Sequence, residues 1–501
     1  MRSWHVPTPL PGAERPAPRL GETHTPRRRT WRNIMLMAGF AWRMAVLFLR
    51  GQATAARRAV ETRALLERLG GLWTKVGQLM ATRPDVFSAE LCRELARMQD
   101  RATSIPWDEA KALMEQELCR PCEELFDTID PEPVAAASIG QVHLAVRKGK
   151  QLAVKIQRPH LAELLQQDLR VIRILVRLVR LTAVLSYFLW DDFLWELQQI
   201  LREEIDYRIE AQNLRLMRRT LARHDIRVPK VERSLSTRRV LVMEYFGGVY
   251  MSEYIDAVAS GDGAGLTSWL YENDINPKKV ARRLLLSFRR QLFEDNLFHG
   301  DLHPGNIMLL RGSEVALIDF GSVGRLEGVF FRKYRMFARA WSRQEYAKAV
   351  DILYLMYPRL PDIDLSALKE RLVRVVRAWE TRAGTRGIPY TEKSFTTCIV
   401  ELSRILFGAH CPMDWTFMRV LRAQSTLDMS LMYLHPDLDQ VRALQDYFQE
   451  WDLRTLNRMA DPGLVRRYAL QLGARVEYDE LRTEQAFLEA EWKRRLSLGD
   501  K

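Results

Sequence analysis

The residues best suited to chemistry lie between His299 and Gly321. Asp301 follows a His-Gly pair, Asn306 comes five positions later, and Asp319 opens an Asp-Phe-Gly triplet. Transfer of a phosphoryl group from ATP requires carboxylate and amide oxygens placed around Mg²⁺ and the phosphates. We interpret Asp301 as the catalytic residue that orients the nucleophile, and Asn306 and Asp319 as ligands of the metal. Each group alone is also typical of an ordinary turn or helix cap, so its partners elsewhere in the chain decide the interpretation.

Strands must carry the phosphate-binding partners of such a site. The sequence from Pro133 to Ile156 predicts three strands joined by turns, and Lys155 lies on the third, apolar strand. We interpret Lys155 as the catalytic lysine that contacts the phosphates, with a lysine at a surface edge as the alternative. Alanines stand where a protein kinase has glycines, so we expect a stiffer phosphate loop. The other residues expected at the nucleotide in this region are Ala135, Ala136, Ala137, Ser138, Ile139, Gly140 and Val142.

A helix must supply a carboxylate that holds the lysine. The acidic stretch from Asp192 to Arg215 is predicted to be helical, and on an ideal helix Asp206 and Glu210 share a face, whereas Glu204 points elsewhere. We pair the lysine with Glu210 and leave Glu204 for a group on the other side. A solvated acidic face is the alternative.

A predicted buried strand over residues 240–245 ends in Phe-Gly-Gly. It suits a hinge between two lobes, where backbone groups at Glu244 would read the adenine edge. A second lysine, Lys75, lies near Gly77 and Gln78 in a helical stretch from Ala55 to Met98. A surface lysine beside a close helix contact is the alternative to a functional role.

Composition limits the class of protein and of partner. The chain has 501 residues, of which 47% are hydrophobic and 28% charged, as in globular proteins. Its net charge of +13 favours anionic partners. No zinc-finger spacing or basic region with heptads is found, so we expect nucleotide and a membrane surface as partners and no nucleic acid. Five scattered cysteines indicate a reducing, intracellular compartment.

The N-terminal region raises the question of membrane contact. Residues 1–30 are proline-rich and basic, which predicts a flexible tail. The stretch from Ile34 to Leu49 is the most apolar in the chain, contains Arg43 and is the only candidate for a span. It is short for a bilayer span, and a central arginine is costly there. We favour a helix lying on the membrane surface, with a core or partner-packing helix and a true span as alternatives.

Together these residues resemble the UbiB/AarF family of atypical kinase-like (aarF domain-containing) proteins. The resemblance covers roughly residues 55–330. It is carried by three segments, namely Lys75-Val76-Gly77-Gln78 with Thr82-Arg83-Pro84-Asp85, the alanine-rich loop at 135–143, and Glu204-Ile205-Asp206-Tyr207 with Glu210. Trp73 and Phe87-Ser88-Ala89 depart from the family pattern. Residues 332–501 contain no motif that we can interpret.

The resemblance implies a role for the second lysine. It implies that Lys75 pairs with Glu204, and that the segment with Lys75 and Gln78, together with Glu204 and Asp206, occludes the nucleotide site. It also implies ATP binding and hydrolysis with Mg²⁺, and support of ubiquinone or other isoprenoid-lipid metabolism at a membrane.

The expected fold is α+β, a protein-kinase-like two-lobe fold with a helical N-terminal extension and an extra helical C-terminal region. The expected segments are the tail 1–30, the extension 31–130, the N-lobe with inserted helices 131–246, the C-lobe core 247–345 and the helical region 346–501. The chain has no proline between Gly321 and Tyr357. An Ala-Pro-Glu anchor is therefore missing, and we expect no floor for docking a peptide substrate.

We predict an ATP-dependent phosphotransferase or ATPase whose phosphoacceptor is small or lipid-like. The alternatives are a nucleotide-gated, membrane-associated adaptor without essential catalysis, and a protein kinase acting in trans. Expected partners are nucleotide, anionic or isoprenoid lipids, a membrane surface that the protein binds peripherally, and proteins of a lipid-biosynthesis complex.

Overall fold

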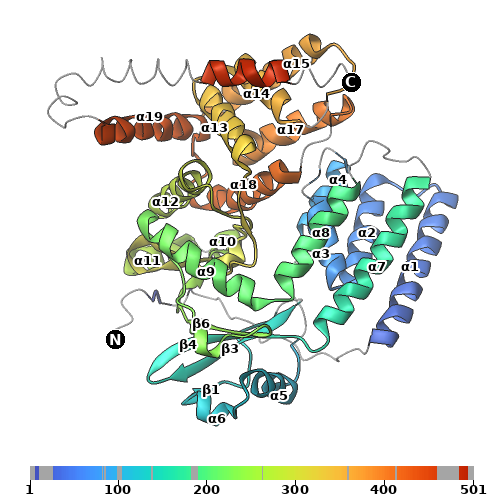
Figure 1. Ribbon diagram of the computed structural model, residues 1–501, viewed down its shortest axis with the longest axis vertical. Helices are drawn as coiled ribbons and strands as arrows, with labels where there is room; N and C mark the ends of the chain where they lie inside the picture. Colours follow the sequence, from blue (N-terminus) through green and yellow to red (C-terminus); the bar gives the residue numbers. More distant parts are fainter. Residues whose placement is uncertain are drawn as a thin grey trace. The chain divides into compact units, whose positions relative to one another are not determined.

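The computed structural model describes residues 6–8, 10, 26–81, 83, 86–98, 104–136, 139–181, 190–261, 263–357, 360–411, 415–459 and 484–494. The fold is mixed α+β and mostly helical, and several helices precede the first strand (Figure 1). It is the kinase-like fold that the sequence predicts.

Helices from two parts of the chain form one helical group. Its members are α1 (Pro26–Leu49), α2 (Ala55–Leu69), α3 (Leu72–Ala81), α4 (Ala89–Ala96), α7 (Leu161–Leu181) and α8 (Trp190–Glu204). Figure 1 shows α1, α2, α7 and α8 side by side. A Cβ at Gly77 in α3 would lie 2.5 Å from Met98 Sδ and 3.1 Å from Leu66 Cδ1, so these two side chains pack closely on the glycine. In α1, residues Trp31–Leu49 have a mean hydropathy of 1.3, which would allow a membrane span by length and composition alone.

An antiparallel sheet carries the predicted phosphate lysine. It contains β1 (Thr128–Ile129), β2 (Ala135–Ala136), β3 (Gly140–Arg147), β4 (Lys150–Gln157) and β6 (Val240–Glu244). The three strands predicted between Pro133 and Ile156 are thus present as β2, β3 and β4. Lys155 lies opposite Val142 on one side and Leu241 on the other. Helices α5 (Trp107–Leu118) and α6 (Cys122–Leu125) contribute Met114 and Leu125 to the core beneath the sheet.

Two smaller sheets hold the loops of the predicted catalytic segment. The first has the order β5 (Ile226–Arg227), β10 (Glu314–Leu317), β9 (Ile307–Leu310) and β7 (Val249–Tyr250). The second pairs β8 (Phe298–His299) with β11 (Val323–Gly324). Strand β10 ends at Leu317, two residues before Asp319, and it is mostly buried. The chain therefore leaves buried strands immediately before the His-Gly-Asp and Asp-Phe-Gly triplets.

The single helix predicted from Asp192 to Arg215 is wrong. The chain forms α8, breaks at Ile205 and Asp206, and begins α9 (Tyr207–Leu221). Asp206 has an extended backbone, and its carboxylate accepts a hydrogen bond from the N–H of Arg208 at 3.0 Å. An aspartate in this position satisfies an N–H group of the first turn that would otherwise lack a partner, so it favours a new helix start.

The prediction of a flexible tail over residues 1–30 is wrong for the described part of the first ten residues. Thr8 donates its N–H to Asn273 Oδ1 at 2.7 Å and accepts at its carbonyl from Trp269 Nε1 at 2.6 Å. Leu10 is 4% exposed. Residues 26–30 belong to α1, and the rest of the predicted tail lies outside the described residues.

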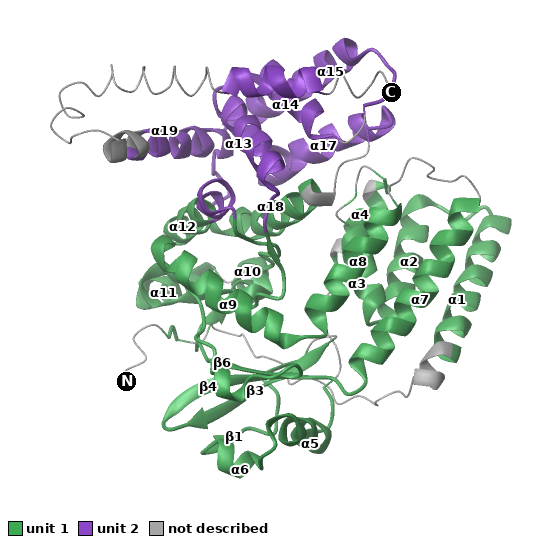
Figure 2. Cartoon of the chain, viewed as in Figure 1, with its two compact units in different colours: residues 1–287, 297–324, 417–434 green, residues 288–296, 325–416, 435–501 purple. Residues whose placement is uncertain are grey.

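The chain divides into two compact units (Figure 2). Unit 1 comprises residues 1–287, 297–324 and 417–434, and it includes α10 (Met251–Ser260), α11 (Gly263–Glu272), most of α12 (Pro277–Arg290) and nearly all of α18 (Trp415–Leu434). Unit 2 includes α13 (Gly328–Ser342), α14 (Tyr346–Met356), α15 (Leu365–Gly384), α16 (Tyr390–Lys393), α17 (Phe395–Gly408), α19 (Gln440–Met459) and a further helical segment at residues 484–494. Helix α18 thus belongs to the unit that holds the predicted site, although it lies far along the chain.

Candidate nucleotide and phosphoryl-transfer site

Lys155 on β4 contacts acidic residues from two other elements. Its Nζ lies 2.7 Å from Glu210 Oε1 on α9 and 3.0 Å from Asp319 Oδ2 in the loop after β10. Burial lowers the pKa of Lys155, but the negative charges of Asp319 and Glu210 outweigh burial and raise the pKa above its ordinary value. The ammonium group therefore stays charged at neutral pH.

The two carboxylates differ in their own titration. Burial raises the pKa of Glu210, and the charge of Lys155 opposes this shift only in part. Burial also acts to raise the pKa of Asp319, but the charge of Lys155 and the N–H of Gly321 lower it to about 2. Asp319 is thus ionised at neutral pH, which is the state in which a carboxylate binds a metal ion.

His299 holds the two catalytic loops together. Its Nε2 lies 2.6 Å from the carbonyl oxygen of Asp319, and its Nδ1 accepts a hydrogen bond from the N–H of Asp301 at 3.1 Å. The accepting Nδ1 assigns the ring proton to Nε2, which donates to the carbonyl. Burial lowers the pKa of His299, so the ring is neutral. A neutral histidine in this tautomer satisfies both loops at once.

Asp301 and Asn306 lie in the same loop. Asn306 Nδ2 donates to the carbonyl oxygen of Asp301 at 3.0 Å, which fixes the amide and directs its oxygen side away from this bond. A Cβ at Gly300 would lie 2.5 Å from Ser322 Oγ, so glycine is required where the two loops pack. Among the described residues, no group of three or more His, Cys, Asp and Glu side chains could hold a metal ion.

The alanine-rich segment is described only in part, since Ala137 and Ser138 lie outside the described residues. Ala135 and Ala136 form β2 and are half-buried, as is Ile139. A Cβ at Gly140 would lie 2.5 Å from the carbonyl oxygen of Ile156 and 2.6 Å from Tyr207 Oη. The packing of β3 on β4 and α9 therefore explains this glycine without a nucleotide.

The hinge residues already use two backbone donors within the fold. The N–H of Glu244 donates to the carbonyl of Lys230 at 2.8 Å, and the N–H of Tyr245 donates to the carbonyl of Gln151 at 3.2 Å. An adenine edge would therefore have to meet carbonyl groups here or backbone groups beyond Tyr245.

The second lysine forms an ion pair in the helical group. Lys75 Nζ lies 3.0 Å from Glu204 Oε1, and both side chains are about one-fifth exposed. Gln78, one turn further along α3, is half-buried. Asp206 is engaged differently, because its carboxylate caps α9 and binds the Arg208 guanidinium at 2.6 Å.

Sequence analysis missed two residues that contact the site and a third that acts through a neighbouring helix. Asn213 on α9 donates to the carbonyl of Phe320 at 3.0 Å, one turn from Glu210. Arg422 on α18 donates to the carbonyl of Gly300 at 3.2 Å and to Ser322 Oγ at 3.1 Å, and its Nη2 lies 3.8 Å from an Asp301 oxygen. The third, Arg419, also lies on α18 and acts through α8. No local pattern marks these residues, since they become neighbours only when the chain folds.

Arg419 joins α18 to α8. It forms a bidentate pair with Glu196, in which Nε donates to Oε1 at 2.9 Å and Nη2 donates to Oε2 at 2.9 Å, and the Glu196 side chain is 5% exposed. Nearby, burial raises the pKa of Glu203 to about 7, with Arg419 and Arg422 acting to lower it and Glu196 acting to raise it. An ion pair therefore links α8, which also carries Glu204, to α18, the helix whose Arg422 contacts the Asp301 loop.

Comparison with known proteins agrees with this geometry. The ABC1 atypical kinase-like domain matches residues 97–353 of the chain. In Arabidopsis thaliana, the chloroplastic protein ACTIVITY OF BC1 COMPLEX KINASE 3 is 29% identical over 88% of this chain and 60% of its own length. An uncharacterized chloroplastic aarF domain-containing protein kinase of the same plant is 30% identical over 76% of this chain and 72% of its own.

A solved structure is also similar. The complex of Rv3197 with erythromycin from Mycobacterium tuberculosis has a TM-score of 0.50 and 25% identity, and the match covers 76% of this chain and 93% of that one. The fold and these matches define an atypical kinase-like protein. The chain belongs to the ABC1 atypical kinase-like domain family, which is of the UbiB type.

Proposed function

We propose that this protein binds Mg·ATP in unit 1 and either hydrolyses it or transfers its γ-phosphoryl group to a small or lipid-like acceptor. The observation that carries the proposal is the convergence of Lys155, Glu210 and Asp319 within hydrogen-bonding distance beside Asp301. Kinase-like catalysis depends on such a lysine–glutamate pair and on an aspartate poised for metal.

Each residue has a definite task in this proposal. Lys155, held by Glu210, contacts the phosphates, and Asp301 orients the attacking group. Asp319 and Asn306 would hold Mg²⁺, which neutralises charge that develops on the phosphates. The oxygen donors suit this ion, which prefers carboxylate and amide oxygens and keeps several waters or phosphate oxygens as further ligands.

An exposed apolar surface supports action at a membrane. On α1, Trp31, Met35 and Trp42 are about 70% exposed. On the neighbouring α7, Ile174 and Leu178 are more than half exposed. Large exposed apolar patches mark interaction sites, and the basic residues around α1 suit anionic headgroups. Ubiquinone or another isoprenoid lipid, which the family resemblance implies, is the acceptor class or pathway that we favour.

The test is ATP turnover by the purified full-length chain with Mg²⁺. Asp319→Asn should lower turnover by at least about a hundred-fold, because an amide cannot replace the charge of a carboxylate toward the metal. Its thermal unfolding should match that of the native chain to show that the variant is folded. Turnover at the native rate in folded Asp319→Asn would overturn the proposal.

The same assay separates the alternative functions. Turnover that rises with vesicles of phosphatidylcholine and phosphatidic acid, but less in Trp31→Gln/Trp42→Gln, supports a lipid-coupled enzyme. Tyr271→Gln is the matched control, because Tyr271 is 88% exposed on α11, away from this patch. Nucleotide binding without turnover would favour the nucleotide-gated adaptor, and efficient phosphorylation of an added protein would favour a protein kinase.

A further inference from the structure

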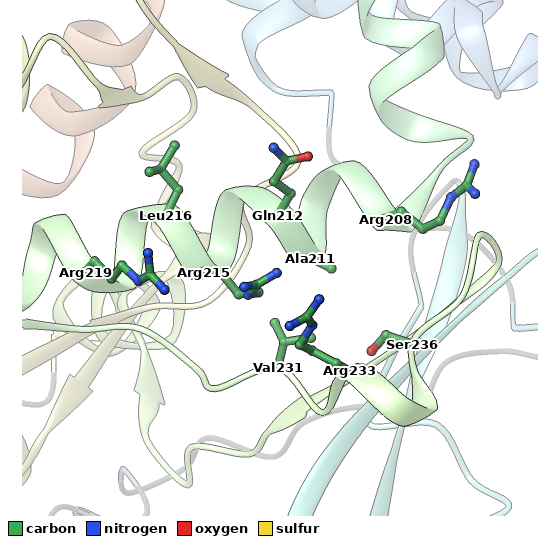
Figure 3. A pocket seen from close by; sticks show the side chains of 9 residues that line it. All are labelled: Arg208, Ala211, Gln212, Arg215, Leu216, Arg219, Val231, Arg233 and Ser236. Carbon is green, nitrogen blue, oxygen red and sulfur yellow. The ribbon is translucent and has the colours of Figure 1, made fainter.

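A cavity of about 500 Å³ lies along α9, on the face turned away from Glu210. Figure 3 shows the side chains that line it. They come from α9 and from the segment between β5 and β6. Its charged residues are Arg208, Arg215, Arg219 and Arg233, and Leu216 and Val231 are its larger apolar residues.

The arginines of this cavity differ in whether a carboxylate balances their charge. Arg208 binds the carboxylate of Asp206 at 2.6 Å. Within the described part of the chain, Arg215, Arg219 and Arg233 form no ion pair with a carboxylate. Figure 3 shows Arg215 from α9 and Arg233 from the turn η2 (Arg233–Leu235) reaching into the same space. Like charges that converge without a counter-ion repel one another, and an anion bound between them would relieve this repulsion.

The shape and charge specify the ligand class. Guanidinium groups bind phosphate oxygens through two parallel hydrogen bonds, and arginines from two elements can hold one phosphate from both sides. The volume lies in the range of small-molecule sites. Val231 is 7% exposed and Leu216 is 37% exposed, so a modest apolar group could lie beside the phosphate.

Helix α9 connects this cavity to the candidate catalytic site. Its opposite face carries Glu210, which binds Lys155, and Asn213, which binds the carbonyl of Phe320. A ligand that fixes α9 from the cavity side would also fix these two contacts, since a helix moves as a rigid element.

We propose that the cavity is a regulatory binding site for a phosphate-bearing ligand, either a free phosphorylated small molecule or a lipid headgroup. Its occupation holds α9 in the position that keeps the Lys155–Glu210 pair formed. The binding itself does not depend on the proposed function, whereas the regulatory effect rests on nucleotide binding in that function.

Calorimetric titration of the full-length chain with inorganic pyrophosphate tests the binding. The nucleotide site is first saturated with Mg·ADP, and free Mg²⁺ is held constant. Loss of two charge-assisted contacts should raise the dissociation constant of Arg215→Gln/Arg233→Gln at least about ten-fold. Arg202→Gln/Arg218→Gln is the matched control, because both residues are exposed on α8 and α9 and neither lines the cavity.

Vesicles separate the two sources of phosphate. Pyrophosphate binding that only the cavity variant weakens supports a soluble ligand. If pyrophosphate does not bind, co-sedimentation with phosphatidic acid vesicles that the cavity variant loses, and the control keeps, supports a lipid headgroup. Equal effects in both variants, or binding of neither probe by the native chain, would overturn the site.

The regulatory part has its own readout. Binding of pyrophosphate should tighten the affinity for Mg·ADP several-fold, and the same factor should appear in the reverse order of addition. If pyrophosphate binds but the affinity for Mg·ADP does not change, the regulatory role is wrong, whereas the binding site itself is supported. A chain that binds pyrophosphate but no Mg·ADP at all would instead contradict the proposed function.

Discussion

At the scale of single residues, Asp319 is shared between two tasks. Without nucleotide its carboxylate accepts from the ammonium of Lys155 at 3.0 Å and from the N–H of Gly321 at 3.0 Å. In the proposed reaction the same carboxylate turns toward a metal ion, and Lys155 turns toward the phosphates. The ion pair with Asp319 keeps Lys155 charged in the absence of nucleotide.

Arg422 offers a test of positioning at this scale. It donates to Gly300 and Ser322, which flank the two catalytic loops, so Arg422→Gln should misplace Asp301. We expect kcat for ATP turnover to fall about ten- to hundred-fold while KM for ATP stays nearly unchanged. Arg422→Lys should recover only part of the rate, because one ammonium cannot reproduce the spacing of the two donors.

Thermal unfolding of both Arg422 variants provides the control. A fall in kcat that simply tracks the loss of folded protein, or a kcat at the native level, would contradict a positioning role.

Glu203 makes a pH-dependent contribution to stability. Because burial raises its pKa to about 7 in the folded chain, the folded state keeps a proton that the unfolded state loses near pH 4.5. This contribution is complete below about pH 4.5 and is lost as the pH rises to about 7. The free energy of unfolding of the native chain, minus that of Glu203→Gln, should fall by about 3 kcal/mol across this window.

Urea unfolding of both chains at several pH values measures this difference. The glutamine variant cancels the contribution of every other titrating group. A difference that is constant with pH would show that folding does not raise the pKa of Glu203.

At the scale of elements, α9 is the helix on which the site depends. It begins at Tyr207 because Asp206 caps it, and this start determines that Glu210 faces β4 and Asn213 faces the Asp-Phe-Gly loop. In a continuous helix through α8 and α9, the directions of the Glu204 and Glu210 side chains around the helix axis would be set by their separation in sequence alone. Glu204 near the end of α8 binds Lys75, and Glu210 on α9 binds Lys155.

The cap at Asp206 can be tested directly. Asp206→Ala should lower the free energy of unfolding by about 1 kcal/mol, whereas Asp206→Asn should cost much less, because asparagine is also a good cap. Urea unfolding measures both variants. If the two variants are equally stable but both lose ATP turnover, the carboxylate acts in the chemistry and not as a cap.

At the scale of the whole molecule, each compact unit is assembled from separate parts of the chain. Unit 1 holds the candidate site and takes α18 from beyond residue 416. The family match ends at residue 353, before this helix. The part of the chain that the family domain covers therefore lacks Arg419 and Arg422, both of which contact unit 1.

Truncation tests this organisation. A chain that ends at residue 411 should unfold at a lower temperature than the full chain and lose ATP turnover, because Glu196 then lies buried without Arg419. A chain that ends at residue 459 keeps α18 and serves as the control. Native turnover and unfolding temperature in the shorter chain would show that unit 1 does not require α18.

The sequence by itself determined the family, the kinase-like fold and the order of the loops that we propose as catalytic. These features depend on local patterns, such as the apolar strand around Lys155 and the spacing from Asp301 to Asp319. Such patterns can be recognised in a single sequence. The sequence also suggested which glutamate would lie near each lysine, although the helix break at Asp206 was missed because capping competes with helical periodicity.

Only the tertiary structure decided how distant residues meet. Arg422 lies more than a hundred residues from Asp301 in the chain, and Thr8 binds Asn273 across 265 positions. The arginine cavity likewise combines α9 with the segment before β6. Such contacts follow from packing of whole elements, and packing depends on many weak interactions at once that no short stretch of sequence records.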